Sequence, residues 1–110
     1  MKISDVPFSV TEWEGVGQTE HKGIKGTSLW KTFEEGNIRA RIVEYSPGFV
    51  SDHYCERGHV VLVLKGSLLL TMKKGDRFII EEGCSFQLSD DASKPHSVSS
   101  EHGAKVFIVD

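Results

Sequence analysis

The sequence predicts an all-β protein, and two features of the chain indicate this class. Its 110 residues include 11 glycines, which recur so often that no window offers a long, uninterrupted helical pattern. Short runs of β-branched and aliphatic residues lie between the glycines, as is typical of strands separated by tight turns. About eight short antiparallel strands in a chain of this length predict a double-stranded jelly roll or small barrel.

We expect the strands to be bounded by residues that favour turns. The predicted strands cover residues 27–33, 38–45, 59–64, 67–72, 77–80, 85–88, 96–98 and 105–109. The separators at 35–37, 46–48, 65–66, 74–76 and 82–83 each supply a glycine for positive φ or a proline with fixed φ. Residues 59–64 are apolar at both parities, which predicts a central strand covered on both faces.

The N-terminal region is predicted as an arm outside the barrel. Ser9 followed by Glu12 fits a capping box for one helical turn, and Gly15 limits anything longer. The chain is short enough for a single domain, 1–110, with an arm over about 1–26 and a barrel over about 27–110.

Composition and charge exclude several function classes. The formal charge is −3 and the longest basic cluster is Lys73-Lys74, which argues against a nucleic-acid partner. The chain opens without the apolar core of a signal peptide, and no apolar run approaches the ~18 residues of a membrane span. We therefore expect a cytoplasmic protein with no membrane partner, in which Cys55 and Cys84 are separate thiols. We expect Cys84 to be a small buried thiol.

The strongest chemical signal is the spacing of His53, Cys55 and His59. Residues two apart in an extended strand share a face, so His53 and Cys55 would point the same way. Gly58 allows a turn that brings His59 back to the same centre. Imidazole and thiolate suit a divalent transition metal, namely zinc, nickel, iron or copper, better than magnesium or calcium. The alternative is a polar cluster with a small thiol and no metal.

These residues resemble the first motif of the cupins, which is a glycine, five residues, His-x-His, three or four residues, Glu, six residues and a glycine. Here Gly48, His53-x-Cys55, His59 and Gly66 follow that order. Cys55 stands at the second histidine and His59 at the glutamate. The Asp-His-Tyr-Cys segment is similar to a subgroup of small single-domain cupins with an Asp, His, Cys and Trp motif.

The second cupin motif is matched in part, by Gly75 and Gly83, with His96 at its histidine after a longer loop. The resemblance thus implies an all-β double-stranded β-helix, the cupin jelly roll, with His53, Cys55, His59 and His96 as metal ligands. His102 is the rival for the fourth position. Because thiolate replaces carboxylate, the site charge is kept and its softness favours zinc, with nickel, iron or copper as alternatives.

Two functions follow from the resemblance, and the sequence leaves both open. The first is a metal-dependent enzyme that acts on a small polar molecule. The second is a non-catalytic cupin that binds a small ligand, with the metal absent or purely structural. Small jelly rolls leave edge strands that pairing with a symmetry mate protects, so we expect a homodimer with contacts around Phe8 and Trp13.

Overall fold

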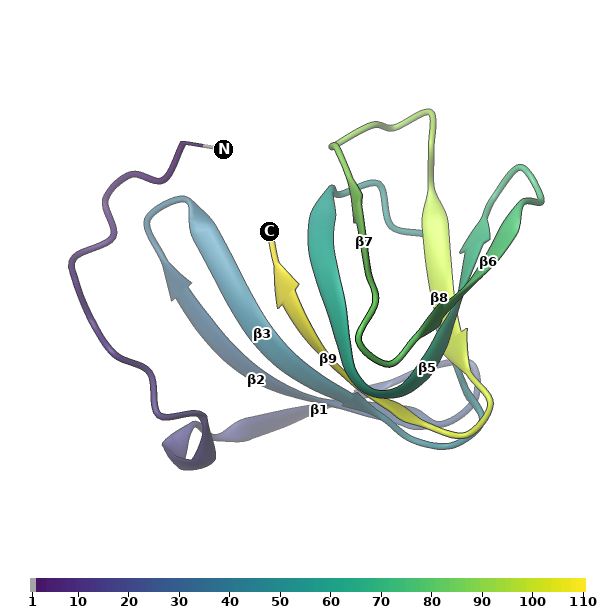
Figure 1. The fold of residues 1–110 in the computed structure, drawn as a ribbon, viewed down its shortest axis with the longest axis horizontal. Helices are drawn as coiled ribbons and strands as arrows, with labels where there is room; N and C mark the ends of the chain where they lie inside the picture. Colours follow the sequence, from purple (N-terminus) through teal and green to yellow (C-terminus); the bar gives the residue numbers. More distant parts are fainter. Residues whose placement is uncertain (1) are drawn as a thin grey trace.

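The chain folds into a single antiparallel sheet that curls into an open barrel (Figure 1). The computed structural model describes residues 2–110. Its elements are η1 (Trp13–Gly15), β1 (Gln18–Lys22), β2 (Thr27–Glu35), β3 (Ile38–Tyr45), β4 (Phe49–Val50), β5 (His59–Met72), β6 (Arg77–Glu81), β7 (Ser85–Leu88), β8 (His96–Ser100) and β9 (Ala104–Val109). The order β1-β2-β3-β9-β5-β8-β4, with β6 and β7 also on β5, confirms the all-β prediction.

β5 holds the two halves of the barrel together. Its first half pairs with β7 and β9, and its second half pairs with β6 and β8. The sequence predicted two strands here with a turn at 65–66, whereas the structure has one strand of 14 residues. The ladder to β9 shifts register between Val63 and Lys65, and Gly66 follows at φ +79°. A left-handed glycine beside a bulge bends one strand across both halves instead of ending it.

The core fills the inside of this curl. It consists of Val43, Val61, Val63, Leu68, Leu70, Phe86, Ala104, Val106 and Ile108. Val61 and Val63 are 3% and 0% exposed, but Val60, Leu62 and Leu64 on the opposite face of β5 are 43%, 36% and 41% exposed. The prediction that both faces of this strand are covered is therefore wrong, because β5 is central in hydrogen bonding while its outer face has no layer packed on it.

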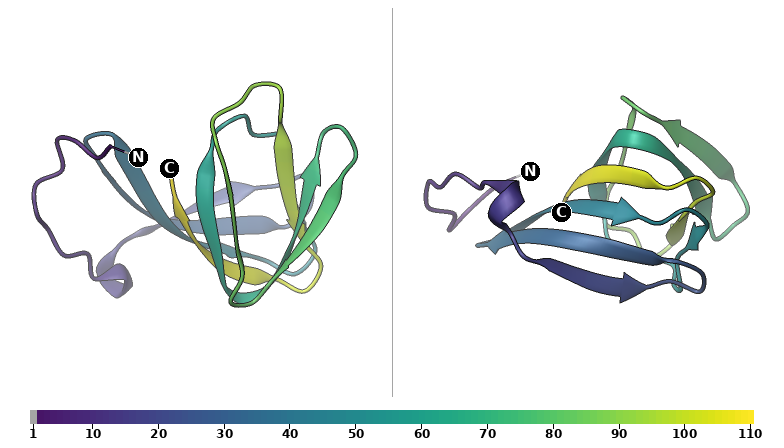
Figure 2. Two further views of the ribbon diagram at one scale, coloured as in Figure 1. Left: turned by 45° about the horizontal axis from the view of Figure 1, so that its top comes forward. Right: turned by 90° about the horizontal axis from the view of Figure 1, so that it is seen from below.

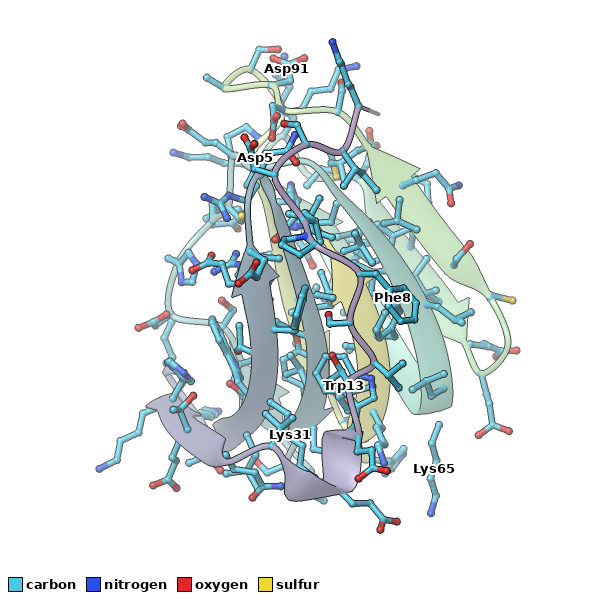
Figure 3. The ribbon with its side chains drawn as sticks, turned by 90° about the vertical axis from the view of Figure 1, so that its left-hand side faces the viewer. Asp5, Phe8, Trp13, Lys31, Lys65 and Asp91 are labelled. Carbon is cyan, nitrogen blue, oxygen red and sulfur yellow. The ribbon has the colours of Figure 1, made fainter. Side chains whose placement is uncertain are left out.

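The segment that precedes η1 lies outside the barrel (Figure 2). It runs over the outer face of the sheet past Phe8 and Trp13 (Figure 3), and Trp13 makes an edge contact with Phe107 of β9 at 6.1 Å between ring centroids. The only helical turn of the described residues is η1, and Glu12 at its start makes no side-chain cap bond, so the capping box does not form. β1 lies within the predicted arm, yet it pairs with β2. None of the residues from 2 onward form a helix long and apolar enough to cross a membrane.

Candidate metal centre

The candidate centre lies where a loop meets the starts of two strands. Cys55, in the loop before β5, forms an isolated β-bridge with His96, the first residue of β8. The Cys55 amide donates to the His96 carbonyl at 2.6 Å, and the His96 amide donates back at 3.0 Å. His59 is the first residue of β5. The fold therefore brings together residues that are up to 41 positions apart (96 − 55). His96 pairs in the sheet with Met72 at the far end of β5, yet its side chain meets that of His59 at the start of the same strand.

The side-chain donors of these residues converge on one point. His59 Nε2 lies 3.5 Å from Cys55 Sγ and 3.1 Å from His96 Nε2, and the donor atoms all lie within 4.8 Å of one another. A tetrahedral ion with metal–nitrogen bonds of about 2.0 Å and a metal–sulfur bond of about 2.3 Å separates two nitrogens by about 3.3 Å, and nitrogen from sulfur by about 3.5 Å. The two distances between donor atoms are close to these edges.

Hydrogen bonds to the other ring nitrogens fix the tautomers of both histidines. His59 Nδ1 lies 2.8 Å from the Asp110 carboxylate, and His96 Nδ1 lies 3.4 Å from the Lys94 carbonyl. Carboxylate and carbonyl oxygens only accept, so each Nδ1 carries a proton, and in the neutral form of each ring the lone pair is on Nε2. Two lone pairs thus face each other at 3.1 Å beside a thiol. A cation between them, either a metal ion or a proton, would satisfy both lone pairs.

Asp110 organises the positive side of the centre, and its carboxylate is 1% exposed. Arg39 donates to it through Nε at 3.0 Å and Nη2 at 3.1 Å, and Arg41 donates through Nη2 at 3.0 Å. Burial alone would raise the pKa of Asp110, but the hydrogen bonds from His59 and Arg39 and the charge of Arg41 hold this pKa well below its usual range. Asp110 is therefore an anion that orients His59.

Asp110, Arg39 and Arg41 were not predicted from the sequence, although strand alternation carried a signal for them. Asp110 continues the buried parity of Val106 and Ile108, and Arg41 shares the parity of Val43. A charged residue at an inward position of a strand needs a buried partner. Arg41 lies on β3 and Asp110 follows β9, which is the neighbouring strand, so each residue supplies the charged partner that the other needs.

A cavity of about 570 Å³ opens beside the centre. Cys55, His59 and His96 lie in its wall, together with apolar and charged side chains from β2, β3, β5 and β8. His96 is 3% exposed, and burial lowers its pKa; the Lys94 carbonyl opposes this shift, and the charge of His59 adds to it. The imidazole of His96 is therefore kept neutral, which is the form that binds metals.

Comparison with known proteins places this architecture among solved structures. No family model matches the sequence, and no curated protein matches it. The structure aligns with an RmlC-like cupin from Shewanella frigidimarina NCIMB 400 at a TM-score of 0.71, with 15% identity over 94% of this chain and 89% of the other. The protein has the cupin fold. The double-stranded β-helix prediction is confirmed.

Two further solved structures align as well. Ectoine synthase from P. lautus aligns at a TM-score of 0.73, with 12% identity over 93% of this chain and 76% of the other. FeII HppE aligns at 0.75, with 11% identity over 98% of this chain and 62% of the other. At these identities the likeness concerns the cupin fold alone.

Of the histidines predicted as ligands, the structure brings His59 and His96 to Cys55 but leaves His53 apart. The His53 side chain is 69% exposed, and its Nδ1 bonds to Asp52 at 2.7 Å. The chain turns between Asp52 and Tyr54 instead of extending, so the strand parity on which the His53 prediction depended does not apply. His53 still borders the cavity, and its ligation stays a prediction.

The remaining candidates of the sequence analysis lie away from the centre. His102, the rival for the fourth position, is 83% exposed beside Glu101. Cys84 is exposed, so the prediction of a buried thiol is wrong. It lies in the turn that precedes β7, where its carbonyl accepts from Val63 while its side chain points outward.

Proposed function

We propose that Cys55, His59 and His96 bind a divalent transition metal ion in this cupin barrel, and that the protein acts on or binds a small polar molecule in the adjoining cavity. The two facing Nε2 lone pairs, 3.1 Å apart and next to a thiol, carry this proposal. Two imidazoles and one sulfur favour zinc, with nickel, iron or copper as alternatives. A structural neighbour described as FeII HppE supports keeping iron among them.

The number of donors decides what the site can do. Structural zinc sites have four protein ligands, whereas catalytic sites have three and leave a position for water or substrate. The structure supplies three donors, and the cavity adjoins them. A bound ion supplies Lewis acidity, or a water of lowered pKa, at that position.

The rest of the chain prepares the donors. Asp110 and the Lys94 carbonyl hold the two rings with Nε2 free to donate a lone pair. The Arg57 amide donates to Cys55 Sγ at 3.4 Å and so helps to hold the sulfur in place. Arg39 fixes Asp110 through a two-point contact.

A structural role for the metal is the second candidate, and one observation favours it. The donors come from the loop before β5, the start of β5 and the start of β8, so an ion would tie the loop to both strands. In this reading the free energy of metal binding adds to the stability of the barrel, and no exchangeable ligand is needed. If His53 turned inward it would close the fourth position.

Metal analysis of single variants tests the proposal. Protein purified without added ions, or loaded with a divalent metal at neutral pH, should hold about one metal ion per chain by elemental mass spectrometry. Cys55→Ser and His96→Ala should each weaken binding by at least about 10-fold. Cys84→Ser and His102→Ala are the matched controls, because both side chains are exposed and outside the group. They should leave the metal content unchanged.

Two outcomes would contradict it. Protein that takes up no metal at neutral pH would show that the three donors do not form a metal site. Equal metal content in Cys55→Ser and Cys84→Ser would show that the ion binds elsewhere. Cobalt substitution separates the two roles: a change in the cobalt spectrum on adding azide indicates an open position, and an unresponsive tetrahedral spectrum indicates a structural ion.

A further inference from the structure

Arg41 is the feature of the cavity that the metal centre leaves unexplained. Its side chain is 6% exposed, and Nη2 donates to Asp110 at 3.0 Å. Its Nε is buried and has no hydrogen-bond partner anywhere in residues 2–110. Buried polar groups nearly always have a partner in the protein, in water or in a ligand. Arg41 also lines the cavity, so its side chain borders the space that a bound molecule would occupy.

Asp110 is already fully engaged and cannot satisfy Arg41 further. Its two oxygens accept two hydrogen bonds from Arg39, one from Arg41 and one from His59. A carboxylate offers about four acceptor sites. The guanidinium of Arg41 has five N–H donors, so most of them are left for another acceptor.

The guanidinium is also held in position before any ligand arrives. Its Cζ lies over the Trp30 ring, 4.5 Å from the centroid. The Trp30 indole donates to Ser28 Oγ at 2.9 Å, and the His21 ring stacks on it with centroids 3.8 Å apart. Three neighbouring strands, β1, β2 and β3, thus contribute to one stack. A preorganised group loses little freedom when it binds.

We propose that this cavity binds a small organic anion, whose carboxylate or phosphate group is bound by the guanidinium of Arg41 next to the metal centre. The inference rests on the proposed function, because it names the class of molecule that the centre would act on or bind. A planar guanidinium matches an oxyanion through two parallel hydrogen bonds. Phe49, Val61 and Phe86 line the same cavity and provide apolar contact for the body of the molecule.

Two carboxylates also line the cavity, and neither cancels Arg41. Asp52 is exposed and pairs with His53 at 2.7 Å. Glu20 is exposed on β1. Exposed charges are screened by solvent, whereas the buried guanidinium is screened much less. The selectivity of the cavity should therefore follow Arg41.

Calorimetric titration of the metal-loaded protein with benzoate, benzamide and phenyl phosphate tests the proposal. Benzoate and benzamide share shape but differ in charge, and phenyl phosphate distinguishes a phosphate site from a carboxylate site. We expect one of the two anions to bind at least about 10-fold more tightly than benzamide. Arg41→Gln should remove that preference, and Arg77→Gln, an equal change of charge at an exposed position on β6, should preserve it.

Arg41→Lys is the second variant, because it keeps the charge beside Asp110 if Arg41→Gln fails to fold; it should weaken anion binding through loss of the two-point contact. Equal binding of the anions and benzamide, or no binding of any of them, would overturn the anion site while leaving the metal site intact. Metal content is measured on the same samples. Anion preference in protein that takes up no metal would overturn the proposed function and leave the anion site standing.

Discussion

Replacement of Asp110 by asparagine tests the link between the fold and the centre. The carboxylate is 1% exposed and accepts hydrogen bonds from His59, Arg39 and Arg41. Asparagine has nearly the same shape, so the change removes charge and leaves volume almost untouched. It also offers an NH₂ group, which can present a donor to His59 Nδ1 and reverse its tautomer.

Two magnitudes follow from this geometry. Loss of a carboxylate that orients a ligating histidine weakens metal binding by about 10- to 100-fold, or about 1.4–2.7 kcal/mol. Arg41 is 6% exposed and loses its anionic partner, which costs about 3 kcal/mol or more of the free energy of unfolding. Both values are large against the 5–15 kcal/mol that a typical domain has in total.

The dependence of stability on acid pH independently tests whether the charged form of Asp110 stabilises the fold. The pKa of Asp110 in the folded state lies below its ordinary value of 3.8. The unfolded chain therefore binds a proton first as pH falls, and the stabilisation, complete above about pH 5, is lost progressively below that. The difference in unfolding free energy between wild type and Asp110→Asn should shrink as the pH is lowered from 5 towards 3.

The assays are urea unfolding across that pH range and competitive metal titration at pH 7.5. Asp76→Asn is the control, because Asp76 is exposed beside a turn and its substitution makes the same change of charge. Asp110→Glu retains the anion and keeps the experiment informative if the asparagine variant is unfolded. Metal affinity and stability that match those of Asp76→Asn would refute the assignment of Asp110 as the partner that orients His59.

Three further perturbations address other parts of the structure. Burial raises the pKa of Tyr45 to about 12, so the free energy of unfolding should fall by about 2 kcal/mol between pH 10 and 12. In urea melts, Tyr45→Phe should reduce this dependence of unfolding free energy on pH. A pH dependence equal to that of wild type would contradict the assignment to Tyr45. Gly66→Ala should lower the free energy of unfolding by more than about 2 kcal/mol in urea melts, because Gly66 has a φ of +79° and a Cβ there would collide with the Gly103 carbonyl. Gly75→Ala is the control, since a Cβ at Gly75 meets no neighbouring atom. A loss at Gly66 no larger than that at Gly75 would count against this explanation. We expect a homodimer with contacts around Phe8, which is 94% exposed, so light scattering should show a dimer for wild type and a monomer for Phe8→Lys. A wild-type monomer at about 10 µM would disprove it.

The sequence predicted the strands well because most of them carry their own turn chemistry. It failed where the local signal is weak. β1 is entirely polar and exposed, so no alternation marks it, and it forms only because β2 offers an edge to pair with. The outer face of β5 is apolar, as is typical of a strand covered on both faces. Only the three-dimensional arrangement shows that these outer side chains are exposed.

The residues of the candidate site were likewise predicted where a local pattern marks them and missed where none does. Cys55 and His59 were predicted from local spacing, and His96 from the resemblance to a motif, and the structure brings these three together. His53 was assigned on strand parity, which depends on an extended backbone that the loop does not adopt. Asp110 is 51 positions from His59, so no local pattern joins them.

The arrangement of charges explains why the centre and the cavity depend on each other. Asp110 is shared: the same oxygen accepts from His59 on the metal side and from Arg41 on the cavity side. A change in the charge of Arg41 or of an anion bound to it would alter the pull of Asp110 on His59, and hence how strongly the ring donates to a metal. Linkage requires the effect to be reciprocal, so metal and anion should each change the affinity for the other by the same factor.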